Sequence, residues 1–397
     1  MSAIRVILAK EFRESLRDRR SLMNALLWGP VFMPLMFFGQ LFVIAKQSQE
    51  IWDKPPSIAV AGAEHAPTLV NFLKQRGAEI RLAPADPAQA VRGLAEDVVL
   101  VIPADYPEQW RRGESAVVEV WHDTSRQRSN SRATRVKVLL NEYSRTIGSL
   151  RLRARGLDPG VALPVRIEEE DVAEGGRGTA MLAAFLPFVL MFSAFMGGFY
   201  LAVDTTAGER ERQSLESLLV NPVPRWQIVL GKLAATVLFA LAATLIGILA
   251  FAAVLALGER FALADVPGLE LHVSGARWVT LGALLIPVVL LASAAETLVA
   301  AFSRTFREAQ TYVQFLMFVP MVPFFIITFN PVKPRALDML VPFWSQSVLI
   351  DRLFRGEALD PLYLALSGGA TVLAAAVLAA AVVWIYRGEK LLFASGD

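Results

Sequence analysis

One carboxylate lies inside a long apolar run of this chain, where an ionisable side chain is expensive to keep. Glu296 is the only charged residue between Trp278 and Phe302, and Ser293 and Thr297 place hydroxyl groups close to it in the sequence. An ionisable residue at such depth indicates a functional position. The grouping predicts a cation or proton site, or a hinge of a translocation path. The alternatives are a structural hydrogen bond to another helix and a protonated carboxyl without a role.

Two glutamines add polar groups to a second apolar run. Gln310 and Gln314 share one face of a helix because they are one turn apart. They line an aqueous path or form hydrogen bonds between helices. The chain has no cysteine, and His65, His122 and His272 are scattered without the spacing of metal ligands. We therefore predict no metal site, and no Ser/His/Asp grouping supports a catalytic site.

The segment Gly208–Lys232 is a charged stretch between two apolar runs. It opens with alternating charges, continues as a short amphipathic helix over Glu209–Val220, and stops at Asn221, where two prolines follow. Its leucines form an apolar stripe, and its charges can pair along the helix. Such a helix docks on a partner protein, or it only anchors a loop at the membrane interface. The residues assigned to docking are Glu209, Arg210, Glu211, Arg212, Leu215, Glu216, Leu218, Leu219, Pro222 and Arg225.

Membrane spans are the elements that must position these residues. The chain is 54% hydrophobic, and its apolar residues are clustered in long runs. A helix needs about 20 apolar residues to cross a bilayer. Proline in such a run predicts a kink packed inside a bundle, as for Pro30 and Pro34 in the first run. The predicted spans are Leu22–Ala45, Thr179–Val203, Leu233–Gly258, Trp278–Phe302, Ala309–Asn330 and Pro361–Tyr386.

The lysines and arginines of the short loops are distributed unevenly. Most lie in the amphipathic segment Ser2–Arg20, in the charged segment after the second span, and in the loops on the same side. By the positive-inside rule, the N-terminus and the C-terminus face the cytoplasm, and the long insertion after the first span lies outside. We therefore predict a multi-pass protein of the bacterial cytoplasmic (inner) membrane, in contact with the lipid bilayer.

The predicted fold class is an α-helical polytopic membrane protein, with six transmembrane helices and an inserted extracytoplasmic α/β domain. A polar stretch after the fifth span carries a short helix, whose apolar stripe lies on or dips into the outer face of the bilayer. The predicted parts are a cytoplasmic amphipathic helix (1–21), the first transmembrane helix (22–45), the α/β domain (46–178), and the remaining spans (179–397), with a cytoplasmic coupling loop (204–227) and an outer interfacial segment (330–360).

The insertion alternates short apolar runs with helical patterns, which indicates a partly parallel sheet. Its predicted strands are Ser57–Ala61, Glu79–Leu82, Val98–Ile102, Val117–Trp121 and Val165–Glu169. Its predicted helices are Ala66–Gly77, Pro87–Glu96, Tyr106–Arg112 and Ser125–Arg155.

The charged segment resembles the cytoplasmic loop of type-2 permeases of ATP-binding-cassette exporters. It departs from that pattern at Gln213-Ser214, where Gly-Thr is usual, at Asn221, where Thr or Ser is usual, and at Gln227, where Glu is common. A second stretch, Ser303–Gln310, is similar to a short loop in the sodium-export (NatB-like) branch. The matching positions of the charged segment are Gly208, Glu209, Arg210, Glu211, Arg212, Leu215, Glu216, Leu218, Leu219, Pro222, Val223, Arg225, Gly231 and Lys232.

The resemblance implies a permease subunit that works with partners. ATP and Mg would bind to separate ABC ATPase subunits, and a second permease copy or a paralogue would complete the pathway. The chain has no phosphate-binding loop of the GxxxxGK[ST] type, so we expect no ATPase site and no cofactor of its own. No nucleic acid is expected as a partner.

The resemblance further implies efflux by alternating access, with Na+ as the suggested cargo. Export of drugs, peptides, lipids or polysaccharide is the alternative within this class. A membrane sensor with an extracytoplasmic ligand domain is the alternative from another class.

Overall fold

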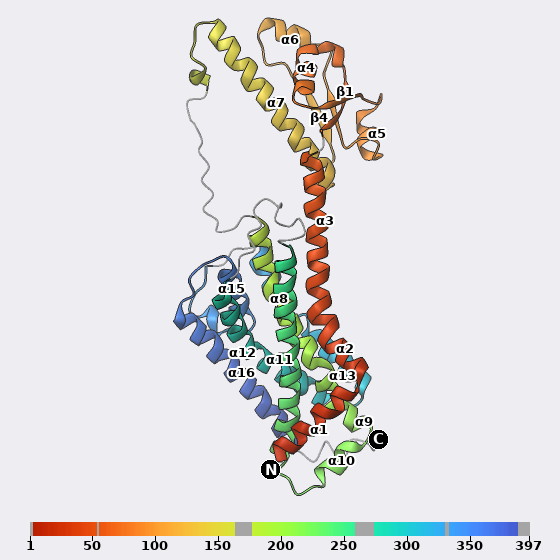
Figure 1. Ribbon diagram of the computed structural model, residues 1–397, viewed down its shortest axis with the longest axis vertical. Helices are drawn as coiled ribbons and strands as arrows, with labels where there is room; N and C mark the ends of the chain where they lie inside the picture. The colour runs from red at the N-terminus through yellow and green to blue at the C-terminus, as the bar shows by residue number, and fades with distance from the viewer. Residues whose placement is uncertain (1–2, 54, 163–176, 259–273, 330–332, 388–397) are drawn as a thin grey trace. The chain divides into compact units, whose positions relative to one another are not determined.

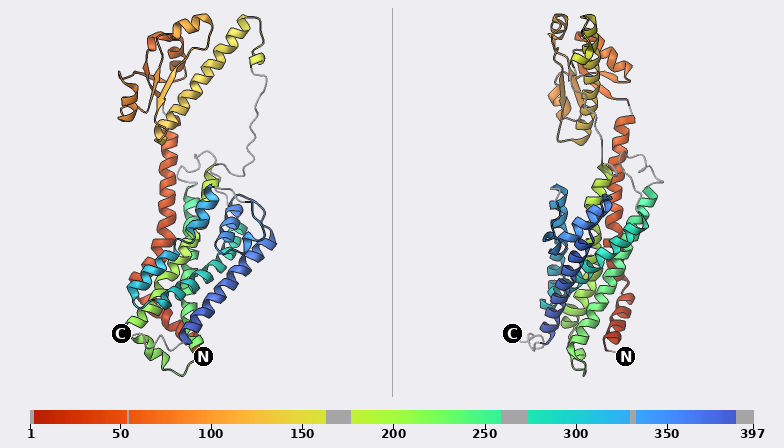
Figure 2. Two further views of the ribbon diagram at one scale, coloured as in Figure 1. Left: turned by 180° about the vertical axis from the view of Figure 1, so that it is seen from behind. Right: turned by 90° about the vertical axis from the view of Figure 1, so that its left-hand side faces the viewer.

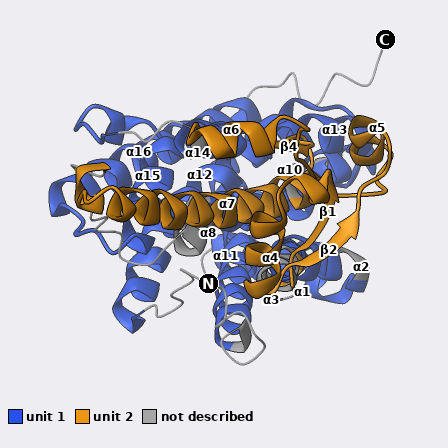
Figure 3. Ribbon diagram, turned by 90° about the horizontal axis from the view of Figure 1, so that it is seen from above, with its two compact units in different colours: residues 1–42, 172–397 blue, residues 43–171 orange. Residues whose placement is uncertain are grey.

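The computed structural model describes residues 3–53, 55–162, 177–258, 274–329 and 333–387. The chain forms two compact units, which Figure 3 colours separately. Unit 1 contains Met1–Phe42 and Val172–Asp397, and unit 2 contains Val43–Asp171. The predicted strand Val165–Glu169 lies outside the described residues.

Unit 2 is built on a four-stranded sheet with the strand order β2-β1-β3-β4. The central strand β1 (Ser57–Ala61) pairs in parallel with β2 (Glu79–Leu82) and β3 (Val98–Val101), and β4 (Glu119–His122) runs antiparallel to β3. Short helices connect the parallel strands, as a parallel pairing requires. The helices of this unit are α4 (Pro67–Gln75), α5 (Pro87–Arg92), α6 (Tyr106–Arg112) and α7 (Gln127–Ala154).

Side chains of the central strands alternate between two packed faces. Ile58 and Val60 are buried in the larger cluster with α4, α6 and α7, while Ala59 packs in a smaller cluster with α5. This two-residue alternation is the ordinary geometry of a strand that is covered on both faces. Unit 2 therefore has its own hydrophobic core.

Unit 1 is a bundle of helices that run side by side, as the two views of Figure 2 show. The chain enters it through α1 (Ala3–Arg17), α2 (Arg19–Met23) and η1 (Asn24–Phe32), and α3 (Met33–Asp53) leads into unit 2. The later elements are α8 (Arg177–Val203), η4 (Asp204–Gly208), α9 (Glu209–Glu211), α10 (Ser214–Leu219), α11 (Arg225–Gly258), α12 (Gly275–Phe302), α13 (Phe306–Leu316), α14 (Met321–Phe329), α15 (Trp344–Phe354) and α16 (Pro361–Arg387).

Among the described residues, 5 helical stretches are long and apolar enough to cross a membrane. The first of them is the most enclosed: 72% of its most apolar 18-residue stretch is buried, whereas the value for the last is 17%. The predicted first span, Leu22–Ala45, is helical as α2, η1 and α3 but is not among these 5. The stretches are Phe185–Glu211, Arg225–Ala256, Gly275–Phe302, Phe306–Ile327 and Pro361–Arg387.

Two helices differ from a regular α-helix where proline and glycine occur. The predicted kink at Pro30 takes the form of a π-helix, η1, in which Gly29 lies so close to Met196 that a Cβ would meet its side chain at 2.7 Å. The predicted fifth span is interrupted by a turn between α13 and α14, immediately before Met321. Proline explains both interruptions, because it cannot donate the backbone hydrogen bond of a helix.

The helix α15 corrects the prediction of an outer interfacial segment. Instead of lying on a surface, it is buried in the main core of unit 1 together with residues of α8 and α12. Gln346 is fully buried and donates hydrogen bonds to Thr371 (2.6 Å) and to the backbone oxygen of Ser367 on α16. The polar residues in this stretch suggested exposure, but they serve to join two helices inside the core.

Candidate functional site

The charged segment after α8 is not the single helix that its amphipathic pattern predicts. The α8 helix continues as the π-helix η4, then as the short helix α9, and the chain turns before α10 begins at Ser214. Gln213 occupies this turn with a φ of 56°. That left-handed region favours glycine, so Gln213 is an unusual residue type for this turn. The turn redirects α10 relative to the charges that precede it.

A buried charge network fixes the start of this segment. The Nζ atom of Lys232 on α11 lies 2.6 Å from Glu209 Oε2 and 3.0 Å from Glu11 Oε1 on α1. Lys10 Nζ lies 3.2 Å from the other oxygen of Glu209. Lys232, Glu11 and Glu209 are all buried. We call Glu11, Glu209, Lys232 and Lys10 the charge network.

The charge network holds Lys10 in its charged form. Burial alone would lower the pKa of this amine, but the carboxylates of Glu209, Glu11 and Glu14 raise the pKa above its ordinary value. A buried ion pair gains little net stability over apolar side chains, but removing one member leaves a buried charge without a partner. The network therefore fixes how α1, α9 and α11 fit together.

The same segment makes hydrogen bonds to the ends of three further helices. Arg210 donates to the backbone oxygen of Ser303, which caps α12, at 3.3 Å. Glu211 accepts a hydrogen bond of 2.6 Å from the backbone N–H of Phe306, the first residue of α13. Arg225 donates to the backbone oxygens of Tyr386 and Arg387 at the end of α16, at 3.0 and 3.1 Å. Figure 1 shows α1, α9 and α10 at this end of unit 1.

The remaining residues of the predicted docking helix divide into buried and exposed ones. Arg212 pairs with Asp204 at 3.0 Å rather than with Glu209. Leu215 is buried in a cluster with Val229 and Tyr386, so it cannot fill a groove on another protein, contrary to the prediction.

The exposed part of the segment is its tip. The side chain of Val220 is 85% exposed, Pro222 is also exposed, and Leu218 is half-buried. The side chains of Glu216 and Leu219 lie outside the described part of the structure.

Glu296 lies on α12 deep inside the bundle and is fully buried. Within the described part of the structure, both of its carboxylate oxygens are without a hydrogen-bond partner, and so is the hydroxyl of Ser293. Thr297 donates instead to the backbone oxygen of Ser293 at 2.7 Å. The predicted grouping of Glu296 with Ser293 is thus present, whereas Thr297 is occupied within its own helix.

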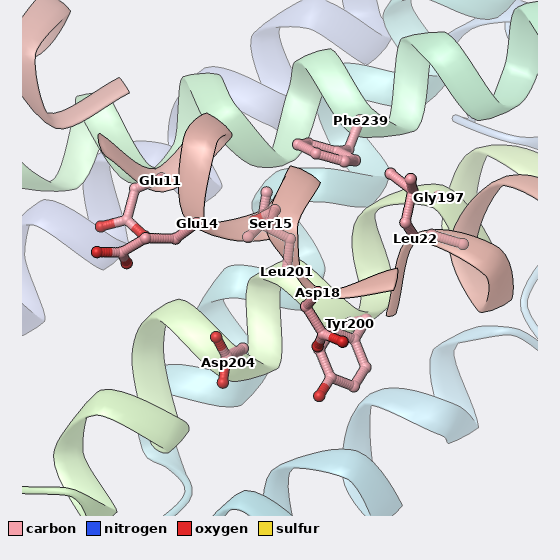
Figure 4. Close-up of a pocket in the computed structure, with 11 residues that line it drawn as sticks. Glu11, Glu14, Ser15, Asp18, Leu22, Gly197, Tyr200, Leu201, Asp204 and Phe239 are labelled. Atoms are coloured by element: carbon pink, nitrogen blue, oxygen red, sulfur yellow. The ribbon is translucent and has the colours of Figure 1, made fainter. Parts of the chain in front are cut away.

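Two cavities lie near these elements in unit 1. A pocket of about 70 Å³ is lined by Glu11, Glu14, Asp18 and Asp204, and Figure 4 shows these four acids, with Asp18 next to Tyr200. Glu11 belongs to the charge network, Glu14 pairs with Lys10, and Asp204 pairs with Arg212, so neighbouring cations neutralise much of the charge of these acids.

The second cavity, of about 650 Å³, is lined by Gln310 together with Trp28, Met196 and Phe199. Gln314 is exposed elsewhere on α13, and Glu296 does not line either of these two cavities. The structure therefore does not bring the two predicted polar groups of the path into one site. Among the described residues, no group of three or more His, Cys, Asp or Glu side chains could hold a metal ion.

Sequence reasoning missed the acid and the lysine that α1 supplies to the charge network. Lys10 and Glu11 lie in an amphipathic segment, where charges ordinarily face water and lipid headgroups. A signal was available, because Glu11 falls on the same helical face as Ile4, Ile7 and Leu8, of which Ile7 is buried. A carboxylate on an apolar face needs a cation, and Lys232 at the start of an apolar run needs an anion.

The chain belongs to the ABC-2 family of transporter proteins, whose pattern matches residues 24–384. It is a multi-pass membrane component of an ABC transporter, and such components work with ATPase subunits. It is similar to the ABC transporter permease protein NatB of Bacillus subtilis (strain 168), with 28% identity over 377 residues, which cover 93% of this chain and 94% of the relative.

Proposed function

We propose that this protein is the permease subunit of an ATP-driven exporter of Na+, and that the segment 204–225 transmits the movement of a separate ATPase. ATP and Mg bind to the ATPase subunits, and two permease chains, either identical or paralogous, enclose the pathway. The permease lies in the bacterial cytoplasmic membrane with the segment and both termini inside and unit 2 outside. Alternating access then moves the ion outward.

The observation that carries this proposal is the set of bonds made by the segment 204–225. Its side chains reach α1, α11, α12, α13 and α16, all at one end of unit 1. A force applied to this segment therefore acts on several membrane helices at once. An interfacial loop that only closes a connection needs no such set of bonds.

The exposed tip of the segment supplies the surface for the ATPase. Val220 and Pro222 are exposed apolar residues beyond the buried Leu215. Exposed apolar side chains at the centre of a contact contribute most of the binding free energy. Docking is therefore assigned to the tip that follows α10, which keeps Pro222 of the predicted docking residues and leaves out the buried Leu215.

The assignment of Na+ has separate support. The loop Ser303–Gln310 resembles that of the sodium-export branch, and Glu211 binds the backbone of this loop at Phe306. The loop that marks the branch is therefore directly bonded to the segment that would receive the ATPase.

Replacing the exposed Val220 by Asp tests the proposal. We expect Val220→Asp to lose most of the co-purifying ATPase subunit, because a charge is then buried in the contact, and to lose ATP-dependent uptake of radioactive Na+ into inverted vesicles. The matched control is Leu82→Asp, which replaces an apolar residue that is 90% exposed in unit 2. The proposed docking surface is wrong if Val220→Asp retains the ATPase as fully as Leu82→Asp does. If the unmodified protein binds its ATPase and responds to ATP but takes up no Na+, then only the assignment of Na+ as the cargo is wrong.

A further inference from the structure

Three oxygen atoms in the middle of unit 1 are buried together, and none of them has a hydrogen-bond partner among the residues that the structure describes. They are Oε1 and Oε2 of Glu296 and the hydroxyl oxygen of Ser293, one turn earlier on α12. Both residues are fully buried. Buried polar atoms are almost always paired in native proteins, so a cluster of unpaired oxygens indicates a site for a ligand that supplies positive charge.

The facing helix α8 leaves space for this carboxylate. A Cβ atom on Gly198 would lie 2.5 Å from Glu296 Oε2, 3.2 Å from a methyl carbon of Thr236 on α11, and 3.5 Å from the Ser293 hydroxyl. The position of that missing Cβ is thus surrounded by oxygens from α12 and by α11. Glycine at this position permits the carboxylate to pack against α8, and three helices enclose the site.

The charged and titratable groups on the neighbouring elements contact residues other than Glu296. On α11, Lys232 is held by Glu11 and Glu209. At the end of α8, Asp204 is held by Arg212. On α16, Tyr386 packs in the cluster around Leu215, and no described cation forms an ion pair with Glu296.

We propose that Glu296 and Ser293 form a binding site for one small monovalent cation, either a proton or Na+. An ionised carboxylate in an apolar interior without a partner costs several kcal/mol, so one positive charge must accompany it. A single carboxylate with a hydroxyl beside it matches one positive charge rather than two. This inference deepens the proposed function, because it names an ion site inside the permease, but its evidence does not depend on the ATPase.

The exchange at this site conserves charge. When α8 moves away from α12, the O–H bond of the protonated carboxyl breaks, the proton passes to water, and Na+ takes its place beside the carboxylate. When the helices close again, the site remains neutral with either ion. The movement needs no oxidant, reductant or covalent intermediate.

Carbodiimide labelling of the purified permease tests the site without any ATPase. Dicyclohexylcarbodiimide adds to protonated carboxyl groups in apolar surroundings, and mass spectrometry of the peptides locates the adduct. We expect labelling at Glu296 in Na+-free choline buffer, at least fivefold slower labelling when Na+ is added, and slower labelling as the pH rises. Glu209 and Glu11 provide internal controls, because each forms an ion pair with Lys232 and should therefore remain unlabelled.

Two variants separate the outcomes. Ser293→Ala keeps the carboxyl but removes one oxygen, so protection should require roughly five- to tenfold more Na+. Glu296→Gln should abolish the labelling of this peptide. If labelling of Glu296 slows as the pH rises but Na+ does not slow it, the cation site at Glu296 is supported and its ligand is the proton. Absence of labelling at Glu296 in Na+-free buffer at low pH, or a rate that neither ion alters, overturns the proposal. Loss of ATPase docking would leave this result unchanged.

Discussion

Two buried carboxylates in unit 1 have opposite environments. Glu209 is surrounded by donors, because Lys232 and Lys10 bind its two oxygens at 2.6 and 3.2 Å. Glu296 is more deeply buried, and neither of its oxygens has a partner in the described ranges of the chain. Both acids lie on or beside membrane helices, so burial alone does not decide what a carboxylate does. The supply of partners separates an acid that joins helices from an acid that awaits an ion.

The charge network and the Glu296 site therefore serve different steps of a transport cycle. A fully paired network keeps its geometry through a cycle, because breaking it exposes buried charges. An unpaired acid changes its state whenever a cation enters or leaves. The charge network therefore suits the transmission of force, and the Glu296 site suits a response to that force.

The largest expected effect comes from removing the cation of the charge network. Lys232→Met leaves Glu209 and Glu11 buried with only Lys10 nearby, which should cost about 3–5 kcal/mol of folding free energy. The measurement is the midpoint of thermal unfolding in detergent, with the exposed Lys333→Met as the matched control. Equal midpoints for the two variants would show that the network does not hold the bundle together.

An intermediate effect is expected at the glycine that faces Glu296. Gly198→Ala forces a methyl group within 2.5 Å of Oε2, so either the carboxylate or α8 must move. We expect a loss of about 1–3 kcal/mol in the same unfolding measurement, as for other overpacked sites. Gly369→Ala on α16 is the control, because nothing lies within 4 Å of its Cβ position. The double variant Gly198→Ala/Glu296→Ala should lose less than the sum of the two single losses, and strict additivity would contradict the close approach.

The smallest loss of folding free energy should come from replacing Glu296. Glu296→Gln keeps the shape of the side chain and breaks no hydrogen bond, so we expect a change of less than about 0.5 kcal/mol. Glu209→Gln should lose about 1.5–3 kcal/mol, because it weakens bonds to two cations. Thermal unfolding of these two glutamine variants measures the difference between the paired acid and the unpaired acid directly. A larger loss at position 296 than at position 209 would reverse our assignment of the two acids.

Local patterns predicted much of unit 2. The strands Ser57–Ala61 and Glu79–Leu82 and the helix Tyr106–Arg112 have the predicted limits. Proline at the start of the helices and glycine after them fix these limits by local chemistry. The strand predicted over Val117–Trp121 instead covers Glu119–His122, because its pairing with β3 sets the register and its own pattern does not.

The site was predictable only in part. Glu296 stood out because one charge in an apolar run is visible in the sequence. The contribution of α1 to the charge network was not visible, since the pairs Lys232–Glu11 and Lys10–Glu209 join residues that are 221 and 199 positions apart along the chain. The break at Gln213 was also missed, because an amphipathic pattern can continue across a turn that only the backbone conformation reveals.

The bonds of Arg225 give the molecule an order of assembly. The charge network needs only α1, α9 and the beginning of α11, all of which leave the ribosome before α12. The oxygens that Arg225 binds belong to Tyr386 and Arg387 at the end of α16, which are 161 and 162 positions further along the chain. Because chains are made from the N-terminus, the charged segment is held at its start before α12 is made and at its end only after α16 is made. The bonds of Arg225 can therefore form only after every helix from α12 to α16 has been synthesised.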